Sequence, residues 1–327
     1  MDIGGTKTDL AVIEASDPRS IVRRATYASG DHLDFEQILD LFLARNSAGS
    51  SAENLVAAAI GVAGPVRDGR SRVTNLPWDL DQSALSERIG VPVVLVNDLV
   101  ALAHGLPCLA EDECRPLQAG VADPAGTALL VAVGTGLGVS ILAPGSAGER
   151  IPLPSEGGHV ELAARDDLEA RLLARIRADA GRAGRADAER VLSGLGWPNL
   201  YFAIRAEDPA LAQPQTDAAV RAQGASAVAA AALAGDRLAT ATLDRWVSWL
   251  GSFVGDLALT TLATGGIYLA GGVTQKNAAR LQDPAFLAAF HAKGTFSTLL
   301  EAIPIRLVQA AEAPLWGAAV VAGRMLA

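Results

Sequence analysis

The sequence predicts an α/β fold of two domains. Short apolar runs rich in β-branched residues alternate with segments whose apolar residues recur at helical spacing, a pattern typical of strands covered by helices. A length of 327 residues is enough for roughly two domains with sizeable cores. Two glycine-rich turns, DIGGTKT at 2–8 and VGTGLGVS at 133–140, hold corresponding places in the two halves. A hydrophobic content of 50% against 19% charged residues excludes a disordered chain.

The first third of the chain predicts alternating strands and helices. TDLAVIE at 8–14 and SIVRRATY at 20–27 have strand patterns. DFEQILDLFLARN at 34–46 carries its apolar residues on one helical face, so we expect a helix there. LVAAAIGVAGP at 55–65 is expected to be a buried strand that ends in a Gly-Pro turn, and a short helix is expected near 81–88.

The segment VPVVLVNDLVALAHG at 91–105 predicts a buried strand followed directly by a helix. Its helical half has Asp98 near the N-cap and Gly105 past the end. A carboxylate at such a junction is costly unless it has partners. Asp98 is therefore either a helix cap or a functional acid or base, and both interpretations stay open at this point.

The remaining two thirds start with a change of composition around 107–126, where Pro, Gly, Asp and Glu indicate a domain boundary. We expect a small domain of residues 1–106 plus 307–327 and a large domain of residues 107–306. Within 107–327 the expected elements are strands in 128–142, helices in 166–264 with a long helix at 237–262, a strand at 267–272, a strand at 303–308 and a final helix at 313–326.

Composition narrows the classes of partner. The net charge is −9, the pI is about 5.0 and no basic block is present, which argues against a nucleic-acid partner. The spacing of Cys108 and Cys114 matches no zinc or redox motif, so two reduced thiols are expected. The uncharged stretch 257–275 contains four glycines and is expected to be a helix end and a strand rather than a membrane span. We expect a cytoplasmic protein with no membrane partner.

The DIGGTKT turn is a candidate phosphate site. Gly4 and Gly5 are expected to permit a turn with positive φ and to let backbone N–H groups approach an anion closely. Thr6 adds a hydroxyl donor, and Asp2 is expected to face Mg²⁺ through water. Lys7 is a further candidate for a phosphate contact. The alternative is an ordinary hairpin turn.

Two more glycine turns lie in the second half. Gly134, Thr135 and Gly136 of GTGLG are candidates for holding the β- and γ-phosphates from the other side. Gly271 and Gly272 follow the strand IYLA and are candidates for bordering adenine or ribose. Ordinary turn geometry is the alternative for both.

SEGGHVEL at 155–162 places Glu156 and His159 on either side of a Gly-Gly turn. A carboxylate and an imidazole together offer acceptors and a donor for vicinal hydroxyl groups. Glu189, in ADAERVLSGLG, is expected at the start of a helix, where a negative charge is also favourable for purely structural reasons. Structural roles remain the alternative for all three side chains.

Six of these segments together resemble one family. TNLPWDLD, NDLVALAHG, GTGLGV, SEGGHVEL, AERVLSGLG and IYLAGGV occur in the order and spacing of the bacterial hexokinase-type glucokinases, across nearly the whole chain. The resemblance implies a two-domain actin-like (ribonuclease-H-like) ATPase fold with an interdomain cleft that closes on the sugar. The chain differs from the related ROK kinases because it lacks their cysteine-rich zinc motif. It also has a short first strand, since only Met1 precedes Asp2.

The resemblance implies an ATP:glucose 6-phosphotransferase that uses ATP and Mg²⁺. Asp98 would be the general base, and Asp2 would be the residue that faces the metal. The sugar-binding residues would be Asn75, Asn97, Asp98, Glu156, His159 and Glu189. The nucleotide-binding residues would be Asp2, Gly4, Gly5, Thr6, Gly134, Thr135, Gly136, Gly271 and Gly272. A homodimer is expected from the resemblance alone. The alternatives are a kinase for another hexose, such as mannose or N-acetylglucosamine, and a sugar sensor without catalysis; polyphosphate as the donor also stays open.

Overall fold

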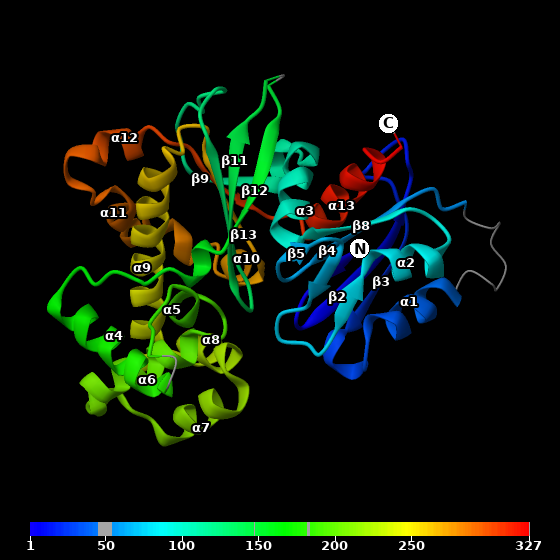
Figure 1. Cartoon of the computed structure of the whole chain (residues 1–327). Coiled ribbons are helices and arrows are strands. Elements are labelled where there is room, and N and C mark those ends of the chain that lie inside the picture. The colour runs from blue at the N-terminus through cyan, green and yellow to red at the C-terminus, as the bar shows by residue number, and fades with distance from the viewer. Residues whose placement is uncertain (45–53, 147, 182–183, 327) are drawn as a thin grey trace. The chain divides into compact units, whose positions relative to one another are not determined.

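The computed structural model describes residues 1–44, 54–146, 148–181 and 184–326, and Figure 1 shows the whole chain. The chain divides into two compact units, each of which is described by itself. Unit 1 comprises Met1–Cys114, Pro152–Pro154 and Ala310–Ala327, and unit 2 comprises Arg115–Ile151 and Ser155–Gln309. Both contain a sheet and helices, so the predicted α/β class is confirmed.

Unit 1 is built on a five-stranded sheet. Its strands, in spatial order, are β3 (Ile21–Ala28), β2 (Lys7–Ile13), β1 (Asp2–Ile3), β4 (Ala58–Val62) and β8 (Val93–Asn97). Its α-helices are α1 (Phe35–Ala44), α2 (Gln82–Ile89), α3 (Asp98–Gly105) and α13 (Ala313–Gly323). A small antiparallel sheet of β5 (Val66–Arg67), β6 (Arg70–Arg72) and β7 (Asp79–Asp81) precedes α2. Residues 45 and 46 of the predicted helix at 34–46 lie outside the described residues.

The side chains of β4 alternate between two helical layers. Ile60 and Val62 are fully buried in a cluster that includes Phe35 of α1. Gly61 points the other way, because a Cβ on it would lie 3.2 Å from the Cβ of Ala101 in α3. Helices α1 and α3 therefore cover opposite faces of this sheet.

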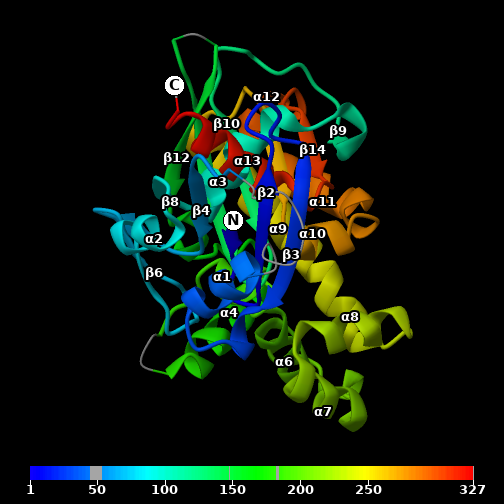
Figure 2. The ribbon, with the colours of Figure 1, turned by 90° about the vertical axis from the view of Figure 1, so that its right-hand side faces the viewer.

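The last helix belongs to unit 1 because it packs on α3 backbone to backbone. A Cβ on Gly105 would overlap the carbonyl oxygen of Ala313, and a Cβ on Gly317 would overlap that of Ala101. The two helices lie side by side in Figure 1 and Figure 2. The two glycines thus fix the C-terminal helix against the helix that starts at Asp98.

Strand β1 is short, as the sequence predicted, and spans only Asp2–Ile3. An apolar cavity of about 430 Å³ lies beside Met1. It is lined by, among others, Ala11 and Ile13 of β2, Ala58 of β4 and Ala318 of α13. The central strand β1 therefore runs beside only the carboxyl end of β4.

A six-stranded sheet forms the centre of unit 2. Its strands, in spatial order, are β12 (Arg150–Ser155), β11 (Leu137–Pro144), β10 (Ala128–Val133), β13 (Ile267–Ala270), β14 (Ile305–Val308) and β9 (Cys114–Gln118). Its α-helices are α4 (Asp167–Asp179), α5 (Glu189–Leu192), α6 (Trp197–Glu207), α7 (Pro214–Gln223), α8 (Ala225–Leu233), α9 (Arg237–Thr261), α10 (Gly272–Lys276), α11 (Pro284–His291) and α12 (Ser297–Glu301).

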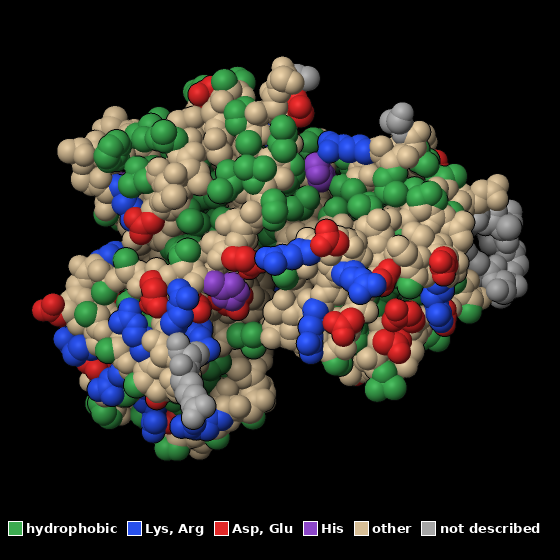
Figure 3. Space-filling model, viewed as in Figure 1, with side chains coloured by type: hydrophobic (Ala, Val, Ile, Leu, Met, Phe, Trp, Pro, Cys, Tyr) green, Lys and Arg blue, Asp and Glu red, His purple; other side chains and the backbone are tan. Residues whose placement is uncertain are grey.

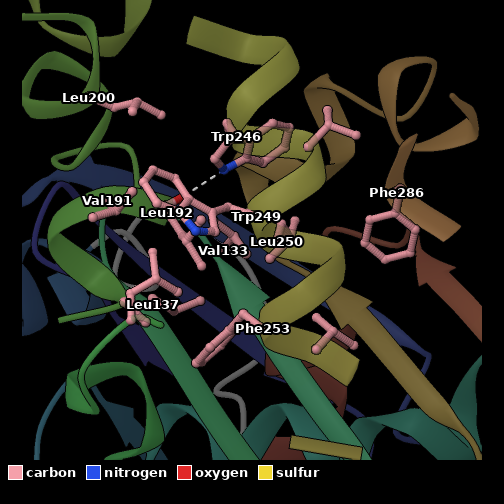
Figure 4. Close-up of a cluster of buried hydrophobic side chains, with 14 of the residues drawn as sticks. Val133, Leu137, Val191, Leu192, Leu200, Trp246, Trp249, Leu250, Phe253 and Phe286 are labelled. Carbon is pink, nitrogen blue, oxygen red and sulfur yellow. Dashed lines mark hydrogen bonds between the residues drawn. The ribbon is translucent and has the colours of Figure 1, made fainter. Parts of the chain in front are cut away.

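The long helix α9 organises the core of unit 2, and Figure 4 shows the part of that core next to α5. The indole Nε1 of Trp246 donates a hydrogen bond of 2.8 Å to the carbonyl oxygen of Leu192. Val133 and Leu137, at the facing ends of β10 and β11, belong to the same buried cluster. Helix α5 and the turn between β10 and β11 thus pack on the same buried cluster.

The sequence also led to expectations about membrane spans, metal motifs and the two cysteines, which concern the whole of the described chain. Among the residues that the structure describes, no helix combines the length and apolar character needed to cross a bilayer. Within the same residues, no group of three or more His, Cys, Asp or Glu side chains is arranged to hold a metal ion. Neither Cys108 nor Cys114 forms a disulfide in the described part of the chain. Figure 3 shows basic and acidic side chains interleaved over the face in view.

Candidate functional site

In unit 1, the predicted acidic residues Asp2, in β1, and Asp98, directly after β8, come from the two strands on either side of β4, near the carboxyl end of β4. Asp2 of β1 pairs with Gly61 of β4, and the next residue of β4, Val62, pairs with Asn97 of β8. A Cβ on Gly61 would lie 3.5 Å from the Cα of Asp98 and 3.6 Å from a carboxylate oxygen of Asp2. Gly61 therefore leaves the space beside which both Asp2 and Asp98 lie.

The helix cap at this junction is Asn97, so the alternative that Asp98 is the cap is wrong, although Asp98 does lie next to the cap as expected. Gly105 was expected past the end of the helix, but it is the last residue of α3. The Oδ1 of Asn97 accepts hydrogen bonds from the backbone N–H groups of Leu99 at 3.0 Å and Val100 at 3.3 Å. Asn97 takes this role because its backbone is extended (ψ 143°), whereas Asp98 is the first helical residue. The Nδ2 of Asn97 also donates to the carbonyl oxygen of Gly64, at 3.2 Å.

Asp98 stands in the first turn of α3. Its Oδ1 accepts a hydrogen bond of 2.9 Å from the backbone N–H of Leu99, and its negative charge is favourable at a helix N-terminus. Because Asn97 already caps the helix, a carboxylate at position 98 is not needed for capping. The structural alternative, a helix cap, therefore does not account for Asp98, and the functional interpretation stays.

Asp2 is a partly buried carboxylate with a perturbed affinity for protons. Burial raises the pKa of Asp2 to about 6; the positive N-terminal amine, Lys7 and Arg24 oppose this rise, and Asp9 adds to it. Among the described residues, no hydrogen bond or ion pair to its carboxylate is found. An acidic group held in this way gains from a nearby cation.

The DIGGTKT turn differs from the expectation in its backbone. Neither Gly4 nor Gly5 has a positive φ, so that part of the prediction is wrong. Gly4 serves close packing instead, since a Cβ on it would lie 3.1 Å from the carbonyl oxygen of Lys7. A Cβ on Gly5 would make only an ordinary contact of 3.7 Å with the Cβ of Asn75. Asn75 has φ 66° and lies against this turn.

Lys7 is engaged by a neighbouring side chain. Its Nζ lies 2.7 Å from Oδ2 of Asp9, a carboxylate that is almost fully buried. Burial alone would raise the pKa of Asp9, but hydrogen bonds from Lys7 and Thr26 outweigh it and lower the pKa. The contact between Lys7 and a phosphate therefore stays a prediction. Its formation would require the ion pair between Lys7 and Asp9 to break.

In unit 2, three predicted motifs meet at the backbone of Leu137. The N–H of Leu137 donates a hydrogen bond of 2.9 Å to Oε2 of Glu189. On the carbonyl side, a Cβ on Gly158 would overlap the oxygen of Leu137, so the Gly-Gly turn packs directly against it. GTGLG, SEGGHVEL and the segment of Glu189 therefore form one connected structure.

The turn Gly134–Leu137, called the GTGL turn below, joins β10 to β11. The Gly134 N–H donates to the Gly136 carbonyl oxygen at 2.9 Å. The segment after α5 donates two further hydrogen bonds, from Gly194 to the Gly134 oxygen at 2.9 Å and from Leu195 to the Thr135 oxygen at 3.2 Å. A Cβ on Gly136 would lie only 2.6 Å from Oε2 of Glu189. A side chain at 136 would therefore displace the Glu189 carboxylate from this position.

Glu156 and His159 lie at the start and end of the Gly-Gly turn that follows β12. His159 Nε2 and Glu156 Oε2 are 3.9 Å apart, and the side chains are 51% and 69% exposed, respectively. Arg185 holds the backbone of this turn through a hydrogen bond of 3.0 Å to the His159 oxygen. The backbone is thus fixed, while both polar side chains remain accessible to a ligand.

Gly271 lies beside the start of the GTGL turn. Strands β10 and β13 are parallel and pair Ala132 with Ala270, so Gly271 follows at the same edge of the sheet. Its φ is 94°, and a Cβ on it would overlap the carbonyl oxygen of Val133. Nothing lies within 4 Å of the place of a Cβ on Gly272, so only Gly271 is sterically required.

Three contributions were missed from the sequence: the space left by Gly61, the contact of Gly158 with Leu137, and the two backbone hydrogen bonds from Gly194 and Leu195. A glycine inside the buried strand pattern LVAAAIGV was a usable signal for close approach at Gly61. The other contacts join residues far apart in the sequence, and no local pattern indicates them.

Comparisons with known proteins agree on one family. A family model described as Glucokinase matches residues 1–325. The glucokinase of Nostoc punctiforme is 34% identical over 341 residues, which cover 99% of this chain and 98% of that protein. The crystal structure of a glucokinase from an Antarctic psychrotroph has a TM-score of 0.80 at 30% identity and covers 99% of this chain and 97% of that one.

A further structure, the glucokinase of Balamuthia mandrillaris in complex with glucose, has a TM-score of 0.81 at 24% identity; the match covers 98% of this chain and 92% of that one and concerns the fold. Together with the sheets and helices of the two units, these likenesses confirm the predicted actin-like ATPase fold. The chain belongs to the bacterial glucokinase family.

Proposed function

We propose that this enzyme transfers the γ-phosphoryl group of ATP to the 6-hydroxyl of glucose, with Asp98 as the general base. The observation that carries the proposal is that Asp2 and Asp98 both lie beside Gly61, near the carboxyl end of the parallel strand β4. Ligands of open α/β sheets bind at such ends. Membership of the glucokinase family supplies the substrate class.

Asp98 is suited to accept the proton of the 6-hydroxyl as that oxygen attacks the phosphorus. Its Oδ1 is held by the Leu99 N–H, which orients the carboxylate. Phosphoryl transfer depends chiefly on positioning and charge stabilisation, so a modest base is sufficient. Asn97 already uses its Oδ1 twice as a cap and one amide hydrogen on Gly64. Its remaining amide hydrogen is the group that we propose for a sugar oxygen.

Asp2 fits a role facing Mg²⁺. Its carboxylate is partly buried and has a raised pKa, and a divalent cation would favour the charged form of such a group. Mg²⁺ keeps several waters and takes few protein ligands, which suits a single carboxylate that acts through water. When bound, the ion would neutralise charge on the phosphates. Gly4, Gly5 and Thr6 would present the turn that follows Asp2 to the same phosphates.

The remaining sugar hydroxyls are assigned to Asn75 of unit 1 and to Glu156, His159 and Glu189 of unit 2. The exposure of Glu156 and His159 supports this assignment, because both side chains are available for hydrogen bonds with a ligand. Several such partners are needed for specificity, since the wrong sugar leaves one of them unpaired.

The nucleotide is assigned to the glycine turns of unit 2. Gly134, Thr135 and Gly136 would form the turn against the β- and γ-phosphates, with the N–H groups of Thr135 and Gly136 toward them, while Gly271 and Gly272 would border the nucleoside. The adjacency of Gly271 to Val133, at the start of the GTGL turn, supports one continuous nucleotide surface in this unit.

The experiment is product identification. Purified enzyme is incubated with MgATP and glucose, and the product is analysed by ³¹P and ¹H NMR. Phosphate on the 6-oxygen with equimolar ADP is the expected result. Phosphate on another oxygen, or ADP without a sugar phosphate, would contradict the proposal.

We also propose that the enzyme acts in the cytoplasm, where ATP is available, and that it forms a homodimer. Fractionation of cells by compartment tests the first point, and light scattering on a sizing column tests the second. An enzyme that is found outside the cytoplasm, or that stays monomeric at assay concentration, would contradict them.

A further inference from the structure

Glu189 stands at the contact between the proposed sugar residues and the GTGL turn. We propose that Glu189 is a positioning residue that couples occupancy of the sugar site to the shape of the GTGL turn, and so to binding of the triphosphate. The inference rests on the proposed function. It adds that the binding affinity for each substrate depends on whether the other is bound.

The backbone of Glu189 is firmly held. It is the first residue of the short helix α5, whose Val191 and Leu192 are fully buried. The Trp246 side chain donates to the Leu192 oxygen, as Figure 4 shows. Ahead of the helix, Ala188 donates to the carbonyl oxygen of Val160, at 2.9 Å, in the segment that follows His159. The backbone from which the carboxylate extends is therefore fixed in place.

The carboxylate and the segment behind it hold the GTGL turn at successive residues. Glu189 Oε2 accepts from the Leu137 N–H at 2.9 Å and fills the place of a side chain on Gly136. Gly194 and Leu195, five and six residues after Glu189, bind the oxygens of the first two residues of the turn. Because of these contacts, a movement of the Glu189 carboxylate would displace the backbone of the turn.

The same turn touches the proposed sugar loop. Gly158, between Glu156 and His159, packs against the Leu137 carbonyl oxygen. Leu137 thus has Glu189 on its N–H side and the sugar loop on its carbonyl side. A sugar that orders this loop and engages Glu189 acts on the two peptide units on either side of Leu137.

The chemistry of the carboxylate permits the shared role. An ionised carboxylate has two oxygens and about four acceptor positions. The Leu137 N–H takes one position on Oε2, and no other hydrogen bond to this side chain is found among the described residues. Oε1 is therefore the acceptor for a sugar hydroxyl. Donation to Oε1 fixes the rotation of the carboxylate, which in turn fixes the direction of the bond to Leu137.

Coupling of this kind is reciprocal: glucose tightens the triphosphate by the same factor by which the triphosphate tightens glucose. We expect glucose to tighten a nonhydrolysable ATP analogue by roughly 5- to 150-fold, the usual range for such coupling. Isothermal titration measures the Kd of the analogue with Mg²⁺, without glucose and with saturating glucose, and the coupling is the ratio of the two values.

Three variants isolate the role of Glu189. Glu189→Ala removes both acceptor oxygens. Glu189→Gln keeps one oxygen for the Leu137 N–H but replaces the other with an amide that donates. Glu301→Ala is the control, because it removes an exposed glutamate at the end of α12 in the same unit. Hydrogen exchange at residues 134–138 is measured on each protein with and without glucose.

We expect the coupling ratio to fall to within about twofold of unity in Glu189→Ala and to stay at the wild-type value in Glu301→Ala. Exchange at the GTGL turn should be faster in Glu189→Ala, while Glu189→Gln keeps the wild-type rate without glucose and loses the slowing by glucose. A wild-type ratio in Glu189→Ala at saturating glucose would overturn the inference and leave Glu189 as a sugar ligand alone. Absence of glucose binding to the wild-type protein would instead refute the proposed function itself.

Discussion

Replacing Asp98 with Asn separates the catalytic role of this residue from its structural surroundings. The substitution keeps the shape of the side chain and an oxygen for the Leu99 N–H, but it removes the proton acceptor. The cap of α3 is untouched, because both capping bonds go to Asn97. The variant is therefore expected to fold and to fail in catalysis.

The two effects differ in size. Loss of a general base lowers kcat by roughly 10²–10⁴-fold, or about 2.7–5.4 kcal/mol at 1.36 kcal/mol per tenfold. The stability cost is the loss of one negative charge near a helix N-terminus, about 0.3–1 kcal/mol. At roughly 2–4 °C per kcal/mol for a domain of this size, Tm should fall by no more than about 4 °C.

The assay measures kcat with coupled detection of ADP and Tm by differential scanning calorimetry on the same preparation. Asp81→Asn is a matched control, since Asp81 caps α2 through the Ser83 and Ala84 N–H groups and lies outside the proposed site. That variant should keep wild-type kcat. Turnover of Asp98→Asn within threefold of wild type would refute the general-base role. A fall in Tm above about 10 °C would contradict the assignment of the cap to Asn97.

Three further predictions address the other parts of the site. Glu156→Gln and His159→Ala should each lower kcat/KM for glucose about 10- to 100-fold, since each leaves a hydroxyl without its charged or aromatic partner; wild-type kinetics in both would remove them from the sugar site. Gly136→Val should weaken binding of the ATP analogue in titrations, because its Cβ lies 2.6 Å from Glu189 Oε2; unchanged analogue affinity would contradict this. With the pKa of Asp2 raised to about 6, the Mg²⁺ concentration for half-maximal velocity should fall as pH rises from 5 to 7, whereas Asp2→Asn should show a smaller fall, because only the titration of the ATP phosphates remains. The folded chain binds that proton more tightly than the unfolded one, so the contribution of Asp2 to stability decreases as pH rises from 3.8 to about 6.

Periodicity predicted most of the elements that position the site. The helical pattern at 237–262 is α9, Arg237–Thr261, and the apolar run at 55–65 contains β4, Ala58–Val62. These segments are predictable because burial of one face dominates their free energy and leaves a period in the sequence. Element ends were less predictable, since capping by Asn97 or by Asp98 depends on one backbone angle that both residues tolerate.

The motifs were visible in the sequence, but the contacts between them were not. Glu189 could be identified as a candidate, yet its hydrogen bond joins it to Leu137, 52 residues away. Gly4 and Gly5 were expected at positive φ, which neither has, whereas Gly4 and Gly136 each have a neighbouring atom within 3.1 Å of the place of a Cβ. Such requirements arise only when distant segments pack, so a local pattern cannot predict them.

Steady-state kinetics with MgATP and a panel of glucose, mannose and N-acetylglucosamine test the proposed activity most directly. The account predicts the highest kcat/KM for glucose, by at least about tenfold, because a sugar that leaves one buried partner unpaired loses 1–3 kcal/mol or more. A higher kcat/KM for either of the other sugars, or no formation of ADP with any of them, would contradict it.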